Sequence, residues 1–275
     1  MNKKSILITG CSSGIGYFCA KALQKDGYHV LATARKEEDV QRLKKEGLEA
    51  FLLDLRYSHS IDNAIAEVRK RTQGKLFALF NNGAYGQPGA LEDLTRDVLH
   101  EQFETNLFGT HELTVKILPL MRAQGYGRII QNSSVLGFVS LRFRGAYNAS
   151  KYALEGLSDT LRLELMDTNI YVSLIQPGPI RSSFRKNALA KFKENIDIDN
   201  SPFAKEYVKK LKSLQSTKDV KFTLGEEAVY EALLHALTSK KPKEHYRITK
   251  PTTFFWILKR LLPTKILDSL LRKVD

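Results

Sequence analysis

Short apolar runs alternate with helical stretches along most of the chain, and this alternation constrains the fold more than any other feature. The runs are continuously apolar, which is typical of strands that are covered on both faces. They comprise residues 5–9, 29–34, 50–53, 76–81, 128–133, 171–176 and 246–249. Strand–helix alternation predicts a parallel sheet with right-handed crossovers and a ligand site beyond the carboxyl ends of the strands. We therefore expect an α/β fold, a doubly wound parallel sheet of about seven strands with helices on both faces.

The first predicted strand runs into a glycine-rich turn that is followed by a helical pattern. Gly10, Gly14 and Gly16 have the spacing G-x-x-x-G-x-G, which differs from the usual dinucleotide fingerprint G-x-G-x-x-G. Glycines let the backbone turn tightly and approach a pyrophosphate. The helix N-terminus offers free N–H groups and the positive end of a dipole. Because many glycine-rich turns are only turns, this spacing alone does not establish a dinucleotide site.

A tyrosine and a lysine lie four residues apart in the run A-Y-N-A-S-K-Y-A, as Tyr147 and Lys151. Residues at this spacing share one side of a helix. An ammonium group beside a phenol favours the phenolate, so we expect Lys151 to lower the pKa of Tyr147 from about 10 toward neutral pH. Ser134, thirteen residues before Tyr147, offers a hydroxyl to hold a substrate oxygen. The three residues together predict a site for proton transfer.

Five motifs, in order, resemble the short-chain dehydrogenase/reductase family over about residues 5–249. They are T-G-C-S-S-G-I-G (9–16), N-N-G-A (81–84), N-L-F-G-T (106–110), the Ser134–Tyr147–Lys151 group and Q-P-G-P-I-R-S (176–182). T-G-C-S-S-G-I-G and A-S-K-Y-A-L-E-G look most like the hydroxysteroid and retinol dehydrogenase branch and related bacterial NADP-dependent aldehyde reductases. The resemblance implies one Rossmann-type domain, residues 1–249, that interconverts an aldehyde or ketone and its alcohol. The rival hypothesis is a dinucleotide-sensing protein that has kept the fold and lost the chemistry.

The resemblance also implies a role for each matched residue. Tyr147 would exchange the proton, Lys151 would assist it and reach the nicotinamide ribose, and Ser134 would polarise the carbonyl. Asn106 would hold a water that connects Lys151 to solvent. The cofactor-binding residues implied are Gly10, Ser12, Ser13, Gly14, Ile15, Gly16, Arg35, Asp54, Leu55, Asn82, Tyr147, Lys151, Pro177, Gly178, Ile180 and Ser182.

Two of these positions carry further expectations. Asp54 matches the acidic residue that contacts the adenine amine in relatives. At 81–84 the family usually has N-N-A-G, whereas this chain has N-N-G-A. A methyl group at Ala84 then stands where the family has a glycine, and we expect it to crowd the cofactor or to alter the turn.

The residue after the second predicted strand indicates which nicotinamide cofactor is used. NAD-dependent Rossmann enzymes place an acid about 20 residues past the glycine turn, on the ribose hydroxyls. This chain has Ala34 and Arg35 there, and Lys36 follows. A guanidinium is suited to grip a 2′-phosphate in bidentate fashion, so we predict NADP(H). The alternative is that Arg35 is merely a solvated side chain at a helix start.

The substrate site is predicted less sharply. Between Ser134 and Tyr147 lies an apolar stretch that includes Phe138 and Leu141, and an apolar wall suits a small aliphatic, isoprenoid or steroid-like carbonyl compound or alcohol. Ordinary packing explains the same residues equally well. The lysine-rich insert at about 183–222 interrupts the alternation where the family has its substrate lid. The substrate-contacting residues expected are Ser134, Phe138, Leu141 and Phe184.

A basic amphipathic extension, residues 250–275, ends the chain. Its apolar stripe comprises Leu262, Ile266, Leu267, Leu270, Leu271 and Val274, and Pro263 should kink it or start a second helix. We expect the stripe to cover the active-site cleft or to dock on another subunit of a homo-oligomer. The alternative is peripheral contact with an anionic membrane surface.

Composition excludes several other classes of protein. The formal charge is +13, but residues 240–275 hold ten Lys or Arg against three acids, and no nucleic-acid motif accompanies them. The six histidines lack metal-ligand spacing, so we expect no metal. Two cysteines, Cys11 and Cys19, cannot form a disulfide framework, and no apolar run is long enough to span a membrane. The first strand begins too early for a signal peptide, so we expect a cytoplasmic protein, with membrane-surface association as the alternative.

Overall fold

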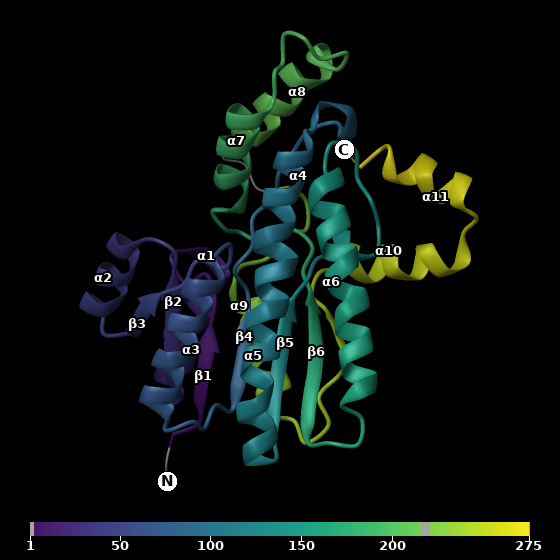
Figure 1. Ribbon diagram of the computed structural model, residues 1–275. Helices are drawn as coiled ribbons and strands as arrows, with labels where there is room; N and C mark the ends of the chain where they lie inside the picture. The colour runs from purple at the N-terminus through teal and green to yellow at the C-terminus, as the bar shows by residue number, and fades with distance from the viewer. Residues whose placement is uncertain (1–2, 216–219, 275) are drawn as a thin grey trace.

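The computed structural model describes residues 3–215 and 220–274, and a seven-stranded sheet forms its centre (Figure 1). The strands are β1 (Ser5–Ile8), β2 (His29–Ala34), β3 (Glu49–Leu52), β4 (Ala78–Asn81), β5 (Gly127–Asn132), β6 (Ile170–Gln176) and β7 (His245–Arg247). Their order is β3-β2-β1-β4-β5-β6-β7, and every pair is parallel. The predicted fold is confirmed, and no predicted strand boundary is wrong by more than two residues.

Helices cover both faces of this sheet. They are α1 (Gly14–Lys25), α2 (Glu37–Lys45), α3 (Ser58–Thr72), α4 (Arg96–Phe103), α5 (Gly109–Gln124), α6 (Gly145–Glu164), α7 (Phe184–Asn195), α8 (Ala204–Gln215), α9 (Glu227–Thr238), α10 (Lys250–Leu261) and α11 (Thr264–Leu271). Apolar side chains of α1, α2 and α9 pack on one face, and those of α3 and α5 pack on the other. Burial on both faces explains why the strands are continuously apolar. No helix in the described part of the chain is long and apolar enough to cross a membrane.

Two segments extend beyond this layered body. Helices α7 and α8 stand above the carboxyl ends of the strands, while α10 and α11 project beside α6 (Figure 1). The insert predicted as a lid, 183–222, contains α7 and α8, although 216–219 lie outside the described residues. Phe192 and Tyr207 are buried in a small apolar cluster that also includes Ala90 and Phe143. The centroids of their two rings lie 5.1 Å apart, in an edge-to-face arrangement. The insert is therefore a packed helical pair, and its division from the main domain stays a prediction.

Candidate active site

One cleft of about 1860 Å³ lies at the carboxyl ends of the strands. Most of the predicted site residues line it, and they come from loops that are far apart in the sequence. The predicted residues in its wall are Gly10, Ser12, Ser13, Gly14, Ile15, Arg35, Asp54, Leu55, Asn82, Ser134, Leu141, Tyr147, Lys151, Pro177, Gly178, Ile180, Ser182 and Phe184. Three others, Gly16, Asn106 and Phe138, lie outside its lining. The parallel sheet thus brings most of the predicted residues together.

The glycine turn between β1 and α1 has a shape that larger residues cannot adopt. Gly10 and Gly14 have φ values of +71° and +57°. A Cβ atom on Gly10 would lie 2.7 Å from the Gly83 Cα atom, and one on Gly16 would lie 2.3 Å from the Gly10 carbonyl oxygen. Ser13 is the N-cap residue of α1, but its side chain makes no capping hydrogen bond. The first N–H groups of α1 therefore face a cradle that fits a pyrophosphate.

The loop after β4 fixes the glycine turn from the opposite side. Backbone N–H groups of Asn82 and Gly83 donate to the Thr9 hydroxyl at 2.9 and 2.8 Å. The Asn82 amide donates to the carbonyls of Thr9 and Gly10 at 2.9 and 3.2 Å. Gly83, and not Ala84, is the residue that packs against Gly10, so the order G-A places the glycine in the tight contact. Ala84 lines the cleft, and the expected effect of its methyl group on the cofactor stays a prediction.

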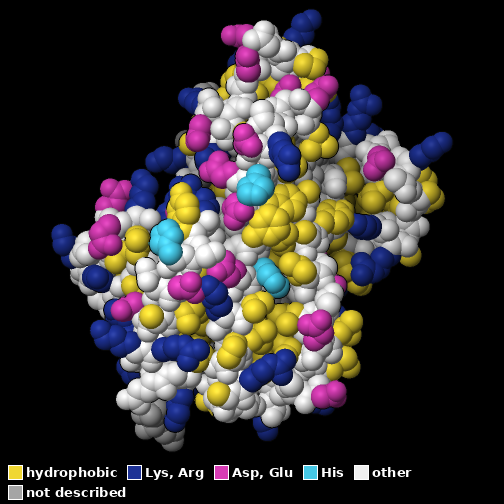
Figure 2. Space-filling model, in the orientation of Figure 1, with side chains coloured by type: hydrophobic (Ala, Val, Ile, Leu, Met, Phe, Trp, Pro, Cys, Tyr) yellow, Lys and Arg dark blue, Asp and Glu magenta, His cyan; other side chains and the backbone are white. Residues whose placement is uncertain are grey.

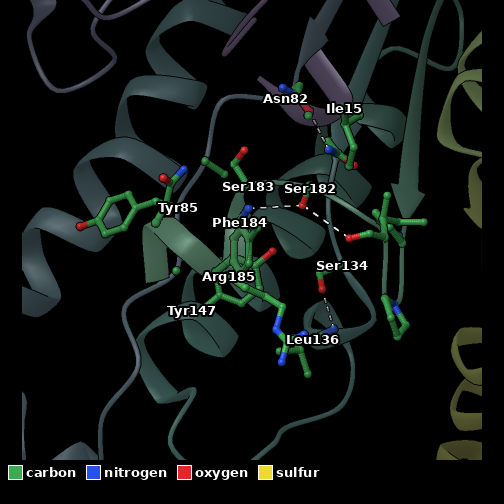
Figure 3. Close-up of a pocket in the computed structure, with 18 of the residues that line it drawn as sticks. Ile15, Asn82, Tyr85, Ser134, Leu136, Tyr147, Ser182, Ser183, Phe184 and Arg185 are labelled. Carbon is green, nitrogen blue, oxygen red and sulfur yellow. Dashed lines mark hydrogen bonds between the residues drawn. The ribbon is translucent and has the colours of Figure 1, made fainter. Parts of the chain in front are cut away.

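The Tyr147 phenol, on the first turn of α6, lies beside the Ser134 hydroxyl, which lowers its pKa. Ser134 also accepts a hydrogen bond from the Leu136 N–H at 3.1 Å, whereas Ser133 points toward Gly137 and Glu155. Figure 3 shows Ser134, Tyr147 and Phe184 on the wall of the same cleft. The Phe184 ring, from the first residue of α7, meets the Tyr147 ring edge to face at 5.2 Å. Of the two neighbouring hydroxyls, that of Ser134 therefore lies beside the phenol, and its contact with a substrate oxygen stays a prediction.

Lys151 lies one helical turn after Tyr147 and is almost fully buried. Its Nζ donates to the Asn132 carbonyl oxygen at 2.7 Å and lies 5.7 Å from the centre of the Tyr147 ring. The Asn132 side-chain Nδ2 donates in turn to the Asn82 side-chain Oδ1 at 2.9 Å. A buried polar chain therefore connects Lys151 to the glycine turn through β5 and the loop after β4. Asn132 was not predicted as a site residue, although it lies one residue before the end of the predicted strand 128–133 and is the last residue of β5.

The expectation of a lowered tyrosine pKa is wrong for this structure. Burial raises the pKa of Tyr147 to about 12, which outweighs the lowering by Ser134 and Arg144. Burial also lowers the pKa of Lys151 to about 8, against a small opposing effect of Glu155. The sequence argument considered the attraction between the two groups but not the cost of burying them. At neutral pH the phenol is therefore protonated.

Asn106 lies within a π-helical turn, Glu104–Phe108, between α4 and α5. Its Oδ1 accepts from the Tyr85 N–H at 3.1 Å, and its Nδ2 donates to the Tyr85 carbonyl at 2.9 Å and to the Ser150 hydroxyl at 3.1 Å. Asn106 thereby joins α6 to a loop that lines the cleft. Such π-helical turns are common at functional sites. The expected contact with a catalytic water stays a prediction.

Charged residues border the adenosine end of the cleft. Arg35 is exposed after β2, and no acid precedes it there. Asp54 is held by Arg56, whose Nη2 lies 2.7 Å from Oδ2. Although burial opposes it, the Arg56 hydrogen bonds lower the pKa of Asp54, and the charge of Arg35 adds to this. The guanidinium that balances the Asp54 carboxylate is therefore that of Arg56, while Arg35 acts on it only through its charge.

The C-terminal extension forms the back of the active-site wall. Leu267 and Leu271 of α11 are buried in a cluster with Leu136, Val139 and Tyr147. Phe138 packs beside this cluster and not in the cleft, and its carbonyl accepts a hydrogen bond from Lys259. Two residues of the stripe therefore pack behind the active-site wall, and α11 follows Pro263 as expected. The expectation that the stripe covers the cleft or docks on another subunit stays a prediction. Ile266 and Val274 are each 51% exposed, so the predicted stripe is wrong at these two positions.

The fold and the cleft together define a dinucleotide-dependent oxidoreductase, and comparisons with known proteins agree. A family model for short chain dehydrogenases matches residues 4–193. The uncharacterized oxidoreductase YbbO of Escherichia coli K12 is 43% identical over 98% of this chain and 94% of its own. Human retinol dehydrogenase 8 is 32% identical over 87% of this chain and 79% of its own. An actinorhodin polyketide ketoreductase solved with NADPH has a TM-score of 0.72 at 26% identity, over 90% of this chain and 95% of its own.

The chain belongs to the short-chain dehydrogenase/reductase family. It is an oxidoreductase of that family, and its cofactor is a nicotinamide dinucleotide.

Proposed function

We propose that this protein is an NADP(H)-dependent reductase of apolar aldehydes or ketones that acts by a Tyr-Lys-Ser-Asn proton relay. The observation that carries the proposal is the Ser134–Tyr147 pair, which lies in one cleft with the glycine cradle and with Lys151 below it. Leu136, Leu141, Phe184 and Phe255 give this cleft an apolar wall that suits an apolar substrate.

The protonation state of Tyr147 favours carbonyl reduction. Its burial keeps the phenol protonated at neutral pH, so the side chain is an acid ready to donate. Ser134 would hold the carbonyl oxygen beside that phenol and polarise it. The bound cofactor supplies the hydride. Tyr147 would then protonate the oxygen as negative charge develops on it, and the Lys151 ammonium would stabilise the resulting phenolate.

Arg35 supports NADP(H) over NAD(H). It is exposed at the cleft, follows β2 directly, and has no acid at the preceding position to bind ribose hydroxyls. The human relative named above is a retinol dehydrogenase and the solved neighbour is a ketoreductase with NADPH, which also supports an apolar carbonyl substrate and this cofactor.

The test is Tyr147→Phe, which removes only the phenolic oxygen. We expect turnover to fall at least about 100-fold, the scale of positioned acid–base catalysis, while NADPH affinity is kept. Tyr126→Phe, which alters an exposed phenol just before β5 and outside this cleft, is the matched control and should stay active. NADPH oxidation is followed with aldehydes and ketones of graded length. If Tyr147→Phe turns over like wild type, the mechanism is wrong, and if wild type reduces none of them, the dinucleotide-sensing hypothesis is favoured.

A further inference from the structure

Helix α10 is apolar on the side that faces solvent as well as on the side that faces the protein. Phe254, Ile257 and Leu261 are 55%, 42% and 73% exposed. Their spacing of three and four residues places them on one side of the helix. Phe255 and Leu258 pack into the cluster behind Tyr147. A helix that only packs on its own protein needs one apolar side, so the exposed side has no function within the fold.

The exposed side of α10 continues into the rim of the active-site cleft. Phe254 is both part of that side and part of the cleft lining, and two further exposed side chains, Phe222 and Val274, line the same cleft. We call Phe222, Phe254, Ile257, Leu261 and Val274 the rim patch. Large exposed apolar patches on soluble proteins usually mark a binding surface.

Positive charge surrounds the rim patch. Lys221 and Lys250 line the cleft beside it, while Lys265, Arg272 and Lys273 are exposed on α11 and just after it. Asp268 is the one acid among residues 250–274. Figure 2 shows hydrophobic side chains next to Lys and Arg side chains on the projection that α10 and α11 form in Figure 1. Any partner must therefore bury apolar side chains and supply negative charge.

Two other basic residues serve the fold. Lys259 donates to the Phe138 carbonyl and, at 3.1 Å, to the Tyr152 hydroxyl. The Arg247 guanidinium, from β7, lies 3.8 Å from the centre of the Trp256 ring on α10. These contacts hold α10 against the body in one orientation. The rim patch is thus a fixed feature of the surface.

We propose that the rim patch and its lysines dock on a bilayer surface that contains anionic lipids, so that the cleft opens at the membrane. An amphipathic helix of this kind buries its apolar side at the headgroup boundary while basic residues meet the lipid charge. A second copy of the chain fits less well, because pairing two rim patches would bring like charges together. The docking itself does not depend on the proposed function. Its consequence, that apolar substrates reach the cleft from the lipid, rests on that function.

Vesicle co-sedimentation tests the docking without any turnover. Full-length protein is mixed with vesicles of phosphatidylcholine alone or of phosphatidylcholine with phosphatidylglycerol, at low and high salt. We expect binding to the anionic vesicles that weakens with salt. Lys265→Gln/Lys273→Gln should weaken it roughly tenfold or more, since each lysine near the surface contributes about 1 kcal/mol. Protein that stays in the supernatant with anionic vesicles, or binds both lipids equally, overturns the proposal.

The apolar contribution is tested with Ile257→Ser/Leu261→Ser, whose side chains lie outside the cleft lining. The matched control is Leu163→Ser/Met166→Ser, which alters two side chains that are 62% and 71% exposed at the far end of α6. Only the first variant should lose vesicle binding, and both should reduce a water-soluble aldehyde in plain buffer as wild type does. Equal loss of vesicle binding in both variants contradicts the proposal that the rim patch binds the membrane. Light scattering that shows dimers of wild type but not of the first variant assigns the patch to self-association instead.

Discussion

Gly16→Ala tests whether the turn between β1 and α1 is a cradle that tolerates no side chain. The new Cβ atom would lie 2.3 Å from the Gly10 carbonyl oxygen and 2.5 Å from the Asn82 Nδ2 atom. Non-bonded heavy atoms prefer about 3.5–4.0 Å, so the turn must open by roughly 1 Å. Overpacking of this kind costs about 1–3 kcal/mol of stability. A displacement of that size at a binding site costs up to about 100-fold in function.

Gly156→Ala is the matched control, because it makes the same chemical change in a helix where a Cβ atom meets nothing within 4 Å. It should raise stability by about 0.5–1 kcal/mol. Urea unfolding is measured for both variants with and without NADPH. Saturating ligand at about 100 times its Kd adds about 2.7 kcal/mol to wild type. At the same ligand concentration, a tenfold loss of affinity leaves about 1.4 kcal/mol of this stabilisation and a 100-fold loss leaves about 0.4 kcal/mol. If Gly16→Ala unfolds and binds NADPH like wild type, the turn is not a close-packed cradle.

Three further predictions concern cofactor choice, the C-terminal helix and a buried carboxyl group. Arg35→Ala should lose about 1–3 kcal/mol of NADPH binding with little change for NADH, while Lys36→Ala should lose little of either; equal wild-type affinities for both cofactors in titrations contradict this. Leu271→Ala should cost about 2–5 kcal/mol and lower activity in plain buffer, whereas the exposed Ile266→Ala should stay within about 0.5 kcal/mol by thermal melting. Burial raises the pKa of Glu155 to about 7 from 4.5. The folded state therefore loses up to about 3 kcal/mol as pH rises through that window, and melts from pH 4 to 8 should show Glu155→Gln gaining stability over wild type by this amount.

The parts of the site that were predictable are those encoded by short spacings. Tyr147 and Lys151 share one side of α6 because they lie one turn apart, and Gly10 to Gly16 form one local turn. The parallel sheet then collects residues that follow different strands, since those ends all meet at one edge. Alternation of strands and helices was therefore enough to predict the fold and the edge of the sheet where the cleft lies, while most of the lining residues were predicted from the resemblance to the family.

Contacts between distant segments were not predictable, because no short sequence spacing indicates which distant residues will meet. Phe138 lies in the predicted stretch between Ser134 and Tyr147, yet it packs toward α10 and away from the cleft. The pKa of Tyr147 depends on how deeply the phenol is buried, and Leu271 from the end of the chain contributes to that burial. Pattern analysis also placed Ile266 and Val274 on one stripe with Leu267 and Leu271, whereas only Leu267 and Leu271 are buried against the body.

The C-terminal extension therefore contributes both to the burial of Tyr147 and to the proposed membrane surface. On its inner side, Leu267 and Leu271 are buried in the same cluster as Tyr147, and burial raises the pKa of that phenol above its ordinary value. On its outer side, Ile257 and Leu261 stay exposed beside a basic surface. If the outer side meets lipid, the same segment both lies where apolar carbonyl compounds enter and helps to bury the phenol that we propose protonates them. Loss of the inner contacts should then change the pH dependence of turnover, while loss of the outer contacts should change only the use of membrane-borne substrate.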